Sequence, residues 1–565
     1  MKSSKSITIL FVLSALMISA FSGCVSDKPI AYYSISRYQQ KQASLGPQKR
    51  GEPNEPLGLI TPKHDQEIKD PNSAPIIPQI TPTKDPVTGK NVYSITVEDA
   101  IVRALSNSPE IRIVSFDPEI AKEEITKAAG LFDVTAFGQL NYDQQDNPVN
   151  SIFQSGESDN RLIQTGLKQR ITTGAEWSAS YAVTRAWDDM TLRSLSTRYE
   201  PVLAFEIKQP LLRDAGEITN LSGVNVARLN HEIALTGFKQ RADEVAAEVM
   251  STYWLLYQSQ NDVKIQKRLV KRTAETLKRL QIRREIDVTQ VQLKQTEVSL
   301  KRRQGTFIQL EKNALDVQDA LLRLLADSQL NLVGDIEIVP QTKPFMEPTK
   351  NETRKILALA INNNPILQQR RLAVAITDIN IKVAKNQKMP RLDLVASTRS
   401  LGLNRRYHDA RNTVSDGDYV SYTVGIMFEI PLGNRQRQAE YRRRRLERSR
   451  AVSDLQNIAD QVAVQTKDQM RATSSDYEEI DIQKQAVDAA NIYLGSLQDT
   501  EKIRKQLTPE FMLVKLQAQE ELATAERSHI RAIADYNVSL TRLAQITGTV
   551  LQFHHVKSSV LQLTE

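Results

Sequence analysis

Cys24 is the only cysteine in the 565 residues, and its thiol is the first group in the chain that could do chemistry. Two lysines and then a short run of apolar residues precede it. A basic start followed by such a run is typical of an export signal, and the run is too short and wrongly flanked for a membrane-spanning helix. The sequence therefore predicts a signal peptide over residues 1–23, followed by a thiol that accepts lipid.

This layout resembles a bacterial lipoprotein signal. The Phe-Ser-Gly run before Cys24 occupies the processing site, and the resemblance implies that the thiol is diacylated. Val25 and Ser26 follow in place of an aspartate, which by the same resemblance favours the outer membrane over the inner membrane. A lipidated thiol leaves no disulfide, so packing and pairing must hold the fold. The alternative is an unrelated buried cysteine.

Arginines crowd the start of a long helical stretch in the second half of the chain. This arginine cluster consists of Arg435, Arg437, Arg442, Arg443, Arg444 and Arg445. It is interpreted as a solvated helix face or, alternatively, as a contact with anionic lipid head groups or a positively charged lumen. The net charge of +7 is small for this length, so we expect no nucleic-acid partner.

No catalytic, metal or cofactor site is predicted. The six histidines show no metal-ligand spacing apart from the adjacent His554 and His555, which are interpreted as surface residues. The chain has no phosphate loop, no His-Glu-x-x-His helix and no glycine-flanked serine elbow. We therefore expect a protein that is not an enzyme and carries no cofactor other than covalent lipid.

Composition favours long helices, because the chain has only 21 glycines and 6% aromatic residues. Beyond Gly23 no stretch approaches 18 consecutive apolar residues, so any membrane crossing would need β-strands. The chain divides into six predicted segments: a signal peptide over 1–23, a proline-rich lipid-tethered linker over 24–93, a first repeat over 94–330, an inter-repeat linker over 331–350, a second repeat over 351–551 and a tail over 552–565.

Each repeat opens with a short amphipathic helix that an Asn-x-Pro turn interrupts, at Pro109 and at Pro365. A strand pair follows. In the second repeat apolar and polar residues alternate cleanly from Val420 to Ile430, which predicts a strand with one apolar face. The first repeat alternates from Leu203 to Ile207, has a weaker strand near 134–142, and adds a hairpin over 165–181 that has no counterpart in the second.

Long helices follow the strands. Proline-free stretches from about 221 to 284 and from about 436 to 505 predict helices of about 95 to 105 Å. After a short break, helices return over about 290–326 and 510–546. In each repeat the opening and returning helices together match the long helix in length. We therefore expect the two shorter helices to stack end to end, antiparallel to the long one.

The order of these motifs along the chain resembles the TolC-like outer membrane efflux protein family. The motifs are the duplicated Asn-x-Pro openings, the strand exits Gln209-Pro-Leu-Leu and Pro431-Leu-Gly-Asn-Arg, and the closing Leu543-Ala-Gln-Ile-Thr-Gly. The resemblance covers residues 94–551. It implies a mainly α fold with a transmembrane β part: a homotrimer in which each protomer gives four strands to one twelve-stranded barrel and its helices to a periplasmic tunnel. The implied function is a passive, lipid-anchored outer-membrane exit duct for small molecules or proteins.

The resemblance also implies a periplasmic adaptor and an inner-membrane pump as partners, docked at the helix tips. The tip residues in question are Arg284, Ile286, Thr289, Lys505, Thr508, Pro509, Phe511 and Val514. Relatives carry a glycine three residues before each tip Ser/Thr, where this chain has Ile286 and Lys505. Phe511 and Val514 stand where a ring of aspartates can lie, so we expect an apolar or basic constriction. Ordinary helix packing is the alternative.

Two other classes of protein are consistent with long helical hairpins. One is a lipid-tethered periplasmic coiled-coil scaffold, which needs no barrel, although the alternation ending at Ile430 argues against it. The other is a periplasmic adaptor, in which a single hairpin is flanked by small β-domains. Two hairpins with inserted strands favour the duct.

Overall fold

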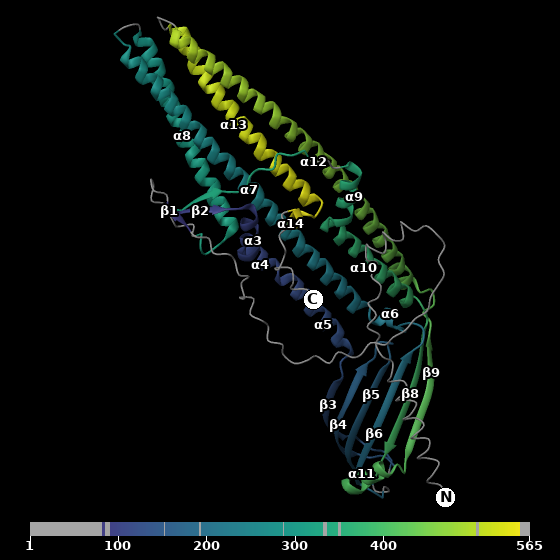
Figure 1. Cartoon of the computed structure of the whole chain (residues 1–565). Helices are drawn as coiled ribbons and strands as arrows, with labels where there is room; N and C mark the ends of the chain where they lie inside the picture. The colour runs from purple at the N-terminus through teal and green to yellow at the C-terminus, as the bar shows by residue number, and fades with distance from the viewer. Residues whose placement is uncertain are drawn as a thin grey trace. The chain divides into compact units, whose positions relative to one another are not determined.

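The structure is a computed structural model that describes residues 82–84, 91–151, 153–190, 194–285, 288–330, 336–348, 352–503 and 508–553 (Figure 1). The chain divides into residues 1–78 and 79–565, and all the described residues belong to the second unit. The predicted signal peptide, Cys24 and nearly all of the 24–93 linker lie outside the described residues. So do Ile286, Lys505 and the tail from residue 554 onward.

Both repeats open as the sequence predicts. In the first, α3 (Val97–Asn107) ends before Pro109, α4 (Pro109–Val114) follows, and α5 (Phe116–Ala129) leads through a 3₁₀ turn to the strands. In the second, α9 (Thr353–Asn363) is followed by α10 (Pro365–Gln387). Each proline stands at the first position of its helix, where no backbone N–H is needed. The Asn364 side chain accepts hydrogen bonds from the next helix's first amides.

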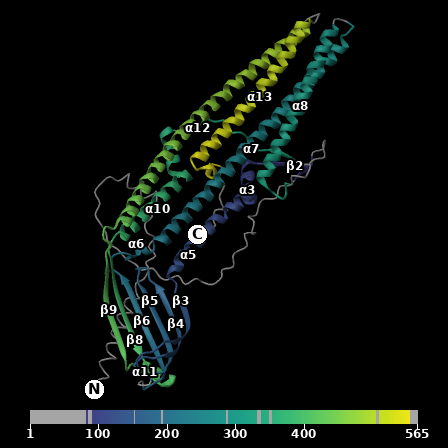
Figure 2. The same cartoon turned by 180° about the vertical axis from the view of Figure 1, so that it is seen from behind.

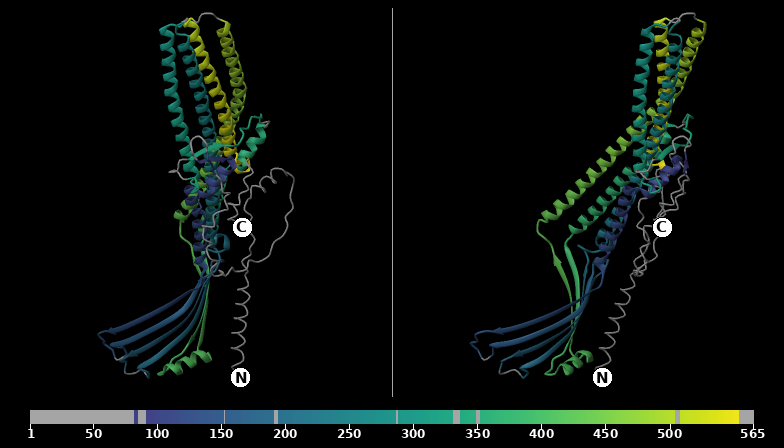
Figure 3. Two further views of the ribbon diagram at one scale, coloured as in Figure 1. Left: turned by 60° about the vertical axis from the view of Figure 1, so that its left-hand side comes forward. Right: turned by 90° about the vertical axis from the view of Figure 1, so that its left-hand side faces the viewer.

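A six-stranded antiparallel sheet stands at one end of the helices (Figures 1 and 3). Its order along the sheet is β3 (Thr135–Asp146), β4 (Glu157–Arg170), β5 (Glu176–Asp188), β6 (Thr197–Pro210), β8 (Arg391–Leu401) and β9 (Val420–Glu429). The first repeat gives four strands and the second gives two. A short helix, α11 (Tyr407–Asp416), joins β8 to β9 at the end of the sheet far from the long helices.

The expectation of four strands per chain is wrong. The hairpin predicted over 165–181 turns at residues 171–175 and extends into two full strands, β4 and β5. They are inserted between β3 and β6, so the sheet has six strands in continuous register. Within one chain the sheet is open, with β3 and β9 as its edges.

The long helices are α7 (Ser222–Ile282, 61 residues) and α12 (Arg435–Ile503, 69 residues), which span about 92 and 104 Å. The returning helices are α8 (Gln290–Leu325) and α13 (Pro509–Ile546). α7 packs along α8 in one part and along α5 in another, and α12 does the same with α13 and α10 (Figure 2). The predicted end-to-end stacking is therefore confirmed.

A small second sheet brings together the segments that precede and follow the helices and strands of the first repeat. β2 (Asn91–Ile95) pairs in parallel with β7 (Ile336–Pro340) and antiparallel with β1 (Thr83–Lys84). The main apolar core lies beside it, where α3, α7 and α8 meet, and includes Ile101, Tyr253 and Leu321. The Tyr253 hydroxyl donates to the Ile95 carbonyl oxygen at 3.0 Å. Two minor helices, α6 (Glu217–Asn220) and α14 (Val550–Phe553), complete the described elements.

Candidate channel-forming surfaces

The six-stranded sheet has one apolar and one polar face. Cross-strand partners lie on the same face, so the register defines rows that cross the whole sheet. One row is Ala136, Leu167, Ala179, Phe205, Thr398 and Tyr422. The next row, on the other face, is Thr135, Lys168, Ser178, Glu206, Ser397 and Thr423. All six strands, including the inserted pair, therefore contribute to both faces.

The apolar face is exposed over most of its area. Tyr422 is 82% exposed, Leu140 77% and Ile426 71%, and the stacked rings of Trp177 and Phe205 lie on the same face. A continuous apolar surface of this extent is too large for contact with water. The strands are 10 to 14 residues long, which is enough for a tilted strand to cross a bilayer. The sheet therefore fits a membrane wall with its polar face turned to a lumen.

Ion pairs concentrate on the polar face where the strands meet the helices. Asp393, only 1% exposed, contacts Arg391 at 2.7 Å and Lys208 at 3.5 Å. The buried Arg213 contacts Glu429 at 3.3 Å. These ion pairs link β6 to β8, and the segment after β6 to β9. They therefore connect strand ends of the first repeat to strand ends of the second.

The arginine cluster lies on the first turns of α12, directly after β9. Arg443 and Arg444 bind Glu440 and Glu447 on the same helix face. The hydrogen bond from Arg443 holds the pKa of Glu440 below its usual range. These two arginines belong to a solvated, internally paired face. For Arg435, Arg437, Arg442 and Arg445 the described residues show no ion pair.

The two flanks of the chain each carry one free strand edge and the helices next to it (Figures 1 and 2). The first flank carries the free edge β3 together with α5 and α8, and the second carries the free edge β9 together with α12. Large apolar side chains stand exposed on both flanks: Ile120, Val298 and Ile308 on the first, and Leu446, Ile482 and Ile492 on the second. Within a single chain these surfaces have no cover.

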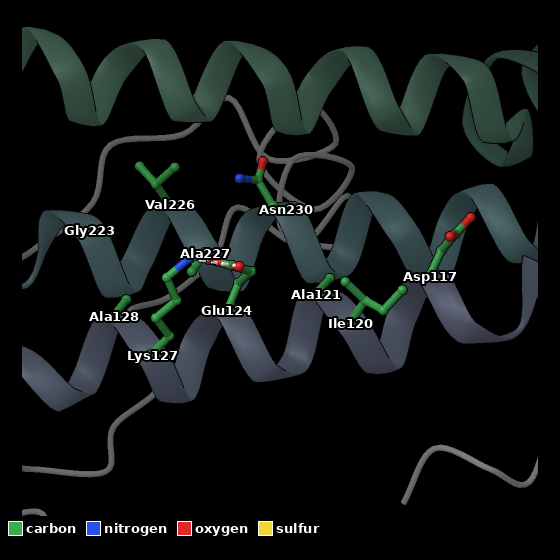
Figure 4. Close-up of a pocket in the computed structure, with 10 residues that line it drawn as sticks. All are labelled: Asp117, Ile120, Ala121, Glu124, Lys127, Ala128, Gly223, Val226, Ala227 and Asn230. Atoms are coloured by element: carbon green, nitrogen blue, oxygen red, sulfur yellow. Dashed lines mark hydrogen bonds and ion pairs between the residues drawn. The ribbon is translucent and has the colours of Figure 1, made fainter.

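A groove of about 620 Å³ runs between α5 and α7 on the first flank (Figure 4). Small residues form its floor, among them Ala121, Ala128, Gly223 and Ala227. Charged residues of α5 stand along its rim, where Glu124 pairs with Lys127 at 3.1 Å. The groove is shallow and open, which suits a helix side chain rather than an enclosed small molecule.

The tip residues fall into three groups. Thr289 caps α8 in a capping box with Gln292, and Thr508 caps α13 with Pro509 at the first helical position. Phe511, 7% exposed, packs with Leu280, Val288 and Met512 inside the chain, which is the ordinary packing alternative for this residue. Arg284 and Val514 are exposed. Of the described tip residues proposed for docking or the aperture, Arg284, Thr289, Thr508 and Val514 are therefore exposed.

A buried polar node, which the sequence interpretation missed, joins the two repeats. The Arg303 guanidinium on α8 is 2% exposed and donates to the Glu520 carboxylate at 3.0 Å, to the Gln519 side-chain oxygen at 3.1 Å and to the Leu516 carbonyl oxygen at 2.6 Å, all on α13. It also donates to Thr273 on α7. Burial lowers the pKa of Arg303, and Glu520 opposes this shift. The sequence gave no signal for this node, because Arg303 is one of many basic residues in α8.

Asp243 on α7 is a buried carboxylate whose Oδ2 atom has no hydrogen-bond partner within the described residues. Burial raises its pKa from 3.8 to about 6. The folded state thus binds the proton more tightly than the unfolded state, so stability is greatest below pH 4 and falls as pH rises to about 6. We expect Asp243→Asn to raise the stability by up to about 3 kcal/mol at pH 7.5 and to give no gain at pH 4.

Thermal unfolding in detergent at both pH values measures this effect. Asp319→Asn, at an exposed position on α8, is the matched control. A pH-independent effect of Asp243→Asn would contradict the assignment.

In the part of the chain that the structure describes, no helix is both long and apolar enough to cross a membrane. Across the same residues, no group of three or more His, Cys, Asp or Glu side chains could hold a metal ion.

Residues 356–549 match a family model described as outer membrane efflux protein. Similar solved structures include a membrane protein from Pseudomonas aeruginosa, at 13% identity over 80% of this chain and 93% of that chain with a TM-score of 0.59. The CmeC outer membrane channel of Campylobacter jejuni matches at 12% identity over 80% and 86%, with a TM-score of 0.58. The outer membrane protein VceC of Vibrio cholerae matches at 13% identity over 80% and 96%, with a TM-score of 0.56. At these identities the likeness establishes the fold. No curated protein matches the chain in sequence.

Proposed function

With its second repeat in the outer membrane efflux protein family and its fold that of solved outer membrane channels, we propose that this protein is the passive exit duct of a tripartite efflux or type I secretion assembly. Three copies close one barrel in the outer membrane and one helical tunnel beneath it. Lipid on Cys24 adds a second attachment to the membrane. Energy comes from an inner-membrane pump.

The observation that carries the proposal is the sheet with one apolar face and two free edges. Lipid offers no hydrogen bonds, so an open edge cannot remain in a bilayer. β3 has 12 residues and β9 has 10, and both lie on the outside of the sheet. Pairing β9 of one copy with β3 of the next satisfies both edges at once.

The helices support the same arrangement. β9 and α12 share one flank, β3 and α5 share the other, and exposed apolar residues lie on both. Joining two different flanks is a head-to-tail contact, which closes into a ring when the rotation allows. α12 then lies against the next copy, and its exposed Leu446 and Ile482 leave water.

Charge favours the same contact. α5 carries four carboxylates, Asp117, Glu119, Glu123 and Glu124, against two lysines, Lys122 and Lys127, so its charge is acidic on balance. It leads into β3 as the arginine cluster leads out of β9. Both segments therefore lie near the sheet, on opposite flanks. We assign the unpaired arginines of the cluster to the acidic α5 of the adjacent copy. Lipid head groups and the lumen are the other surfaces that this positive charge would suit.

The helix tips are the proposed docking surface for a periplasmic adaptor. Arg284 is exposed beside the break between α7 and α8. We expect Arg284→Glu to reduce site-specific crosslinking to the adaptor several-fold, because it reverses the charge at the contact. Arg302→Glu, in the middle of α8, should leave the crosslinking unchanged. Equal crosslinking by both variants would remove Arg284 from the docking surface.

Membrane fractionation combined with gel mobility of unheated and heated protein tests the proposed function, with Cys24→Ser alongside. The duct predicts an outer-membrane, heat-modifiable trimer, and loss of the lipid should weaken targeting without removing the trimer. A soluble or inner-membrane monomer would overturn the duct. It would favour the lipid-tethered scaffold or the periplasmic adaptor instead.

A further inference from the structure

The inserted strands β4 and β5 are part of the sheet's wall. β4 pairs with β3, and β5 with β6, over nearly their whole lengths. They also follow the same alternation: Ile163 and Leu167 lie on the exposed apolar face, at 59% and 45% exposure, while Lys168 and Ser178 lie on the polar face. A hairpin that merely packed on a wall would not continue both faces. The chain therefore contributes six strands to any barrel that it forms.

We propose that three copies close a barrel of eighteen strands, which carries solutes too wide for a twelve-stranded pore. This inference rests on the proposed function. With strands about 4.8 Å apart and tilted by about 40°, eighteen strands enclose a ring about 36 Å across, and twelve strands enclose one of about 24 Å. Side chains occupy about 5 Å on each side, which leaves about 26 Å against about 14 Å.

The polar face is suited to remain open. Many of its side chains are short, including Ser178, Ser180, Ala204, Ser397 and Thr423. The helix that lies on the sheet, α11, covers the other face, where Tyr407 contacts Tyr181 and Tyr199. The larger side chains at the inner end are paired with one another, as Asp393 is with Arg391 and Lys208.

A wider lumen changes the class of cargo. Drug-sized molecules pass a 14 Å opening, so for them two extra strands per chain add nothing. A 26 Å opening admits a polypeptide that retains secondary structure, since a helix with its side chains is about 10 to 12 Å across and a helical hairpin about twice that. The substrate class that fits the six-stranded sheet is therefore a bulky solute such as a partly folded polypeptide.

Graded thiol probes measure the lumen from outside the cell, so the state of the periplasmic tips does not matter. Cys24 is the only native cysteine and is assigned to lipid, so an introduced thiol reports alone. Thr423→Cys places the thiol on the polar face of β9. Val424→Cys, the next residue, faces lipid, and Ser415→Cys on α11 serves as an accessible control. The probes are maleimides on a small dye, on polyethylene glycols of increasing size and on a globular protein about 25 Å across.

Each variant is prepared in the full chain and in a chain that lacks residues 157–188, which removes β4 and β5 through the loops at the far end. We expect Thr423→Cys to react with probes up to about 25 Å in the full chain and only up to about 14 Å in the deletion. The dye should label both. An unchanged size limit would overturn the wide pore while leaving the duct intact.

Other outcomes separate the two proposals. If the dye fails to reach Thr423→Cys while it labels Ser415→Cys, there is no lumen, and the proposed function falls together with the wide pore. If the deletion does not fold, averaged end-on images of the full-length protein decide. A wall about 36 Å across, with a native mass of three chains, supports eighteen strands, whereas one about 24 Å across or a mass of two chains overturns them.

Discussion

Val424→Arg is expected to abolish the proposed heat-modifiable trimer and the proposed location in the outer-membrane fraction. Val424 is 71% exposed at mid-length on the apolar face of the edge strand β9. An arginine near the midplane of a barrel's lipid face costs about 2–4 kcal/mol. A trimer carries the substitution three times, so the penalty reaches about 6–12 kcal/mol, comparable to the whole stability of a typical domain.

Thr423→Arg is the matched control, because it introduces the same residue one position earlier. Successive residues of a strand face opposite sides, so this arginine lies on the polar face among Ser397 and Glu206. We expect it to assemble normally and to alter only the charge of the lumen. Membrane fractionation and unheated gel mobility read out both variants. Equal assembly of the two would show that β9 does not face lipid.

The sequence predicts β9 well because its alternation is local. From Val420 to Glu429 every second residue is apolar, and the strand occupies those residues. The number of strands in the sheet could not be predicted in this way. The hairpin over 165–181 is visible as a turn signal, but its place between β3 and β6 depends on pairing with residues far along the chain. Local sequence patterns identify a strand, but they do not identify the strands with which it pairs.

The small second sheet was missed for a similar reason. β2 and β7 have five residues each and pair across more than 240 positions. Each has three apolar residues among its five, but segments this short give a weak signal, and both lie at or inside predicted linkers. These segments are strands because β2 and β7 pair with each other. The duplicated Asn-x-Pro turns at Pro109 and Pro365, in contrast, act through their own backbone and were predictable.

The tip shows where spacing alone misleads. By resemblance Phe511 stands at an aperture position, yet its side chain packs with Leu280 and Met512 inside the chain. The structure shows Thr289 and Thr508 as the N-caps of α8 and α13. Capping acts within one turn of helix, whereas the direction of a side chain toward core or lumen is set by the neighbouring helices. Val514, 37% exposed, is the apolar residue left for a constriction.

Arg303→Met is expected to lower the free energy of unfolding by about 3–5 kcal/mol. The substitution keeps an unbranched, flexible stem while removing the donors to Glu520, Gln519, Thr273 and the Leu516 carbonyl oxygen. Buried acceptors that lose their donor keep the full cost of desolvation, which exceeds the net value of the bonds themselves. Because the node joins α7 and α8 to α13, we also expect faster amide exchange along both returning helices.

Arg302→Met is the matched control, since the neighbouring side chain is exposed. It should change the unfolding temperature of the detergent-solubilised protein little, while Arg303→Met lowers it clearly. Equal unfolding temperatures for Arg303→Met and Arg302→Met would show that the node does not hold the repeats together. In that case the apolar contacts between α7, α8 and α13 would be sufficient to join the two hairpins.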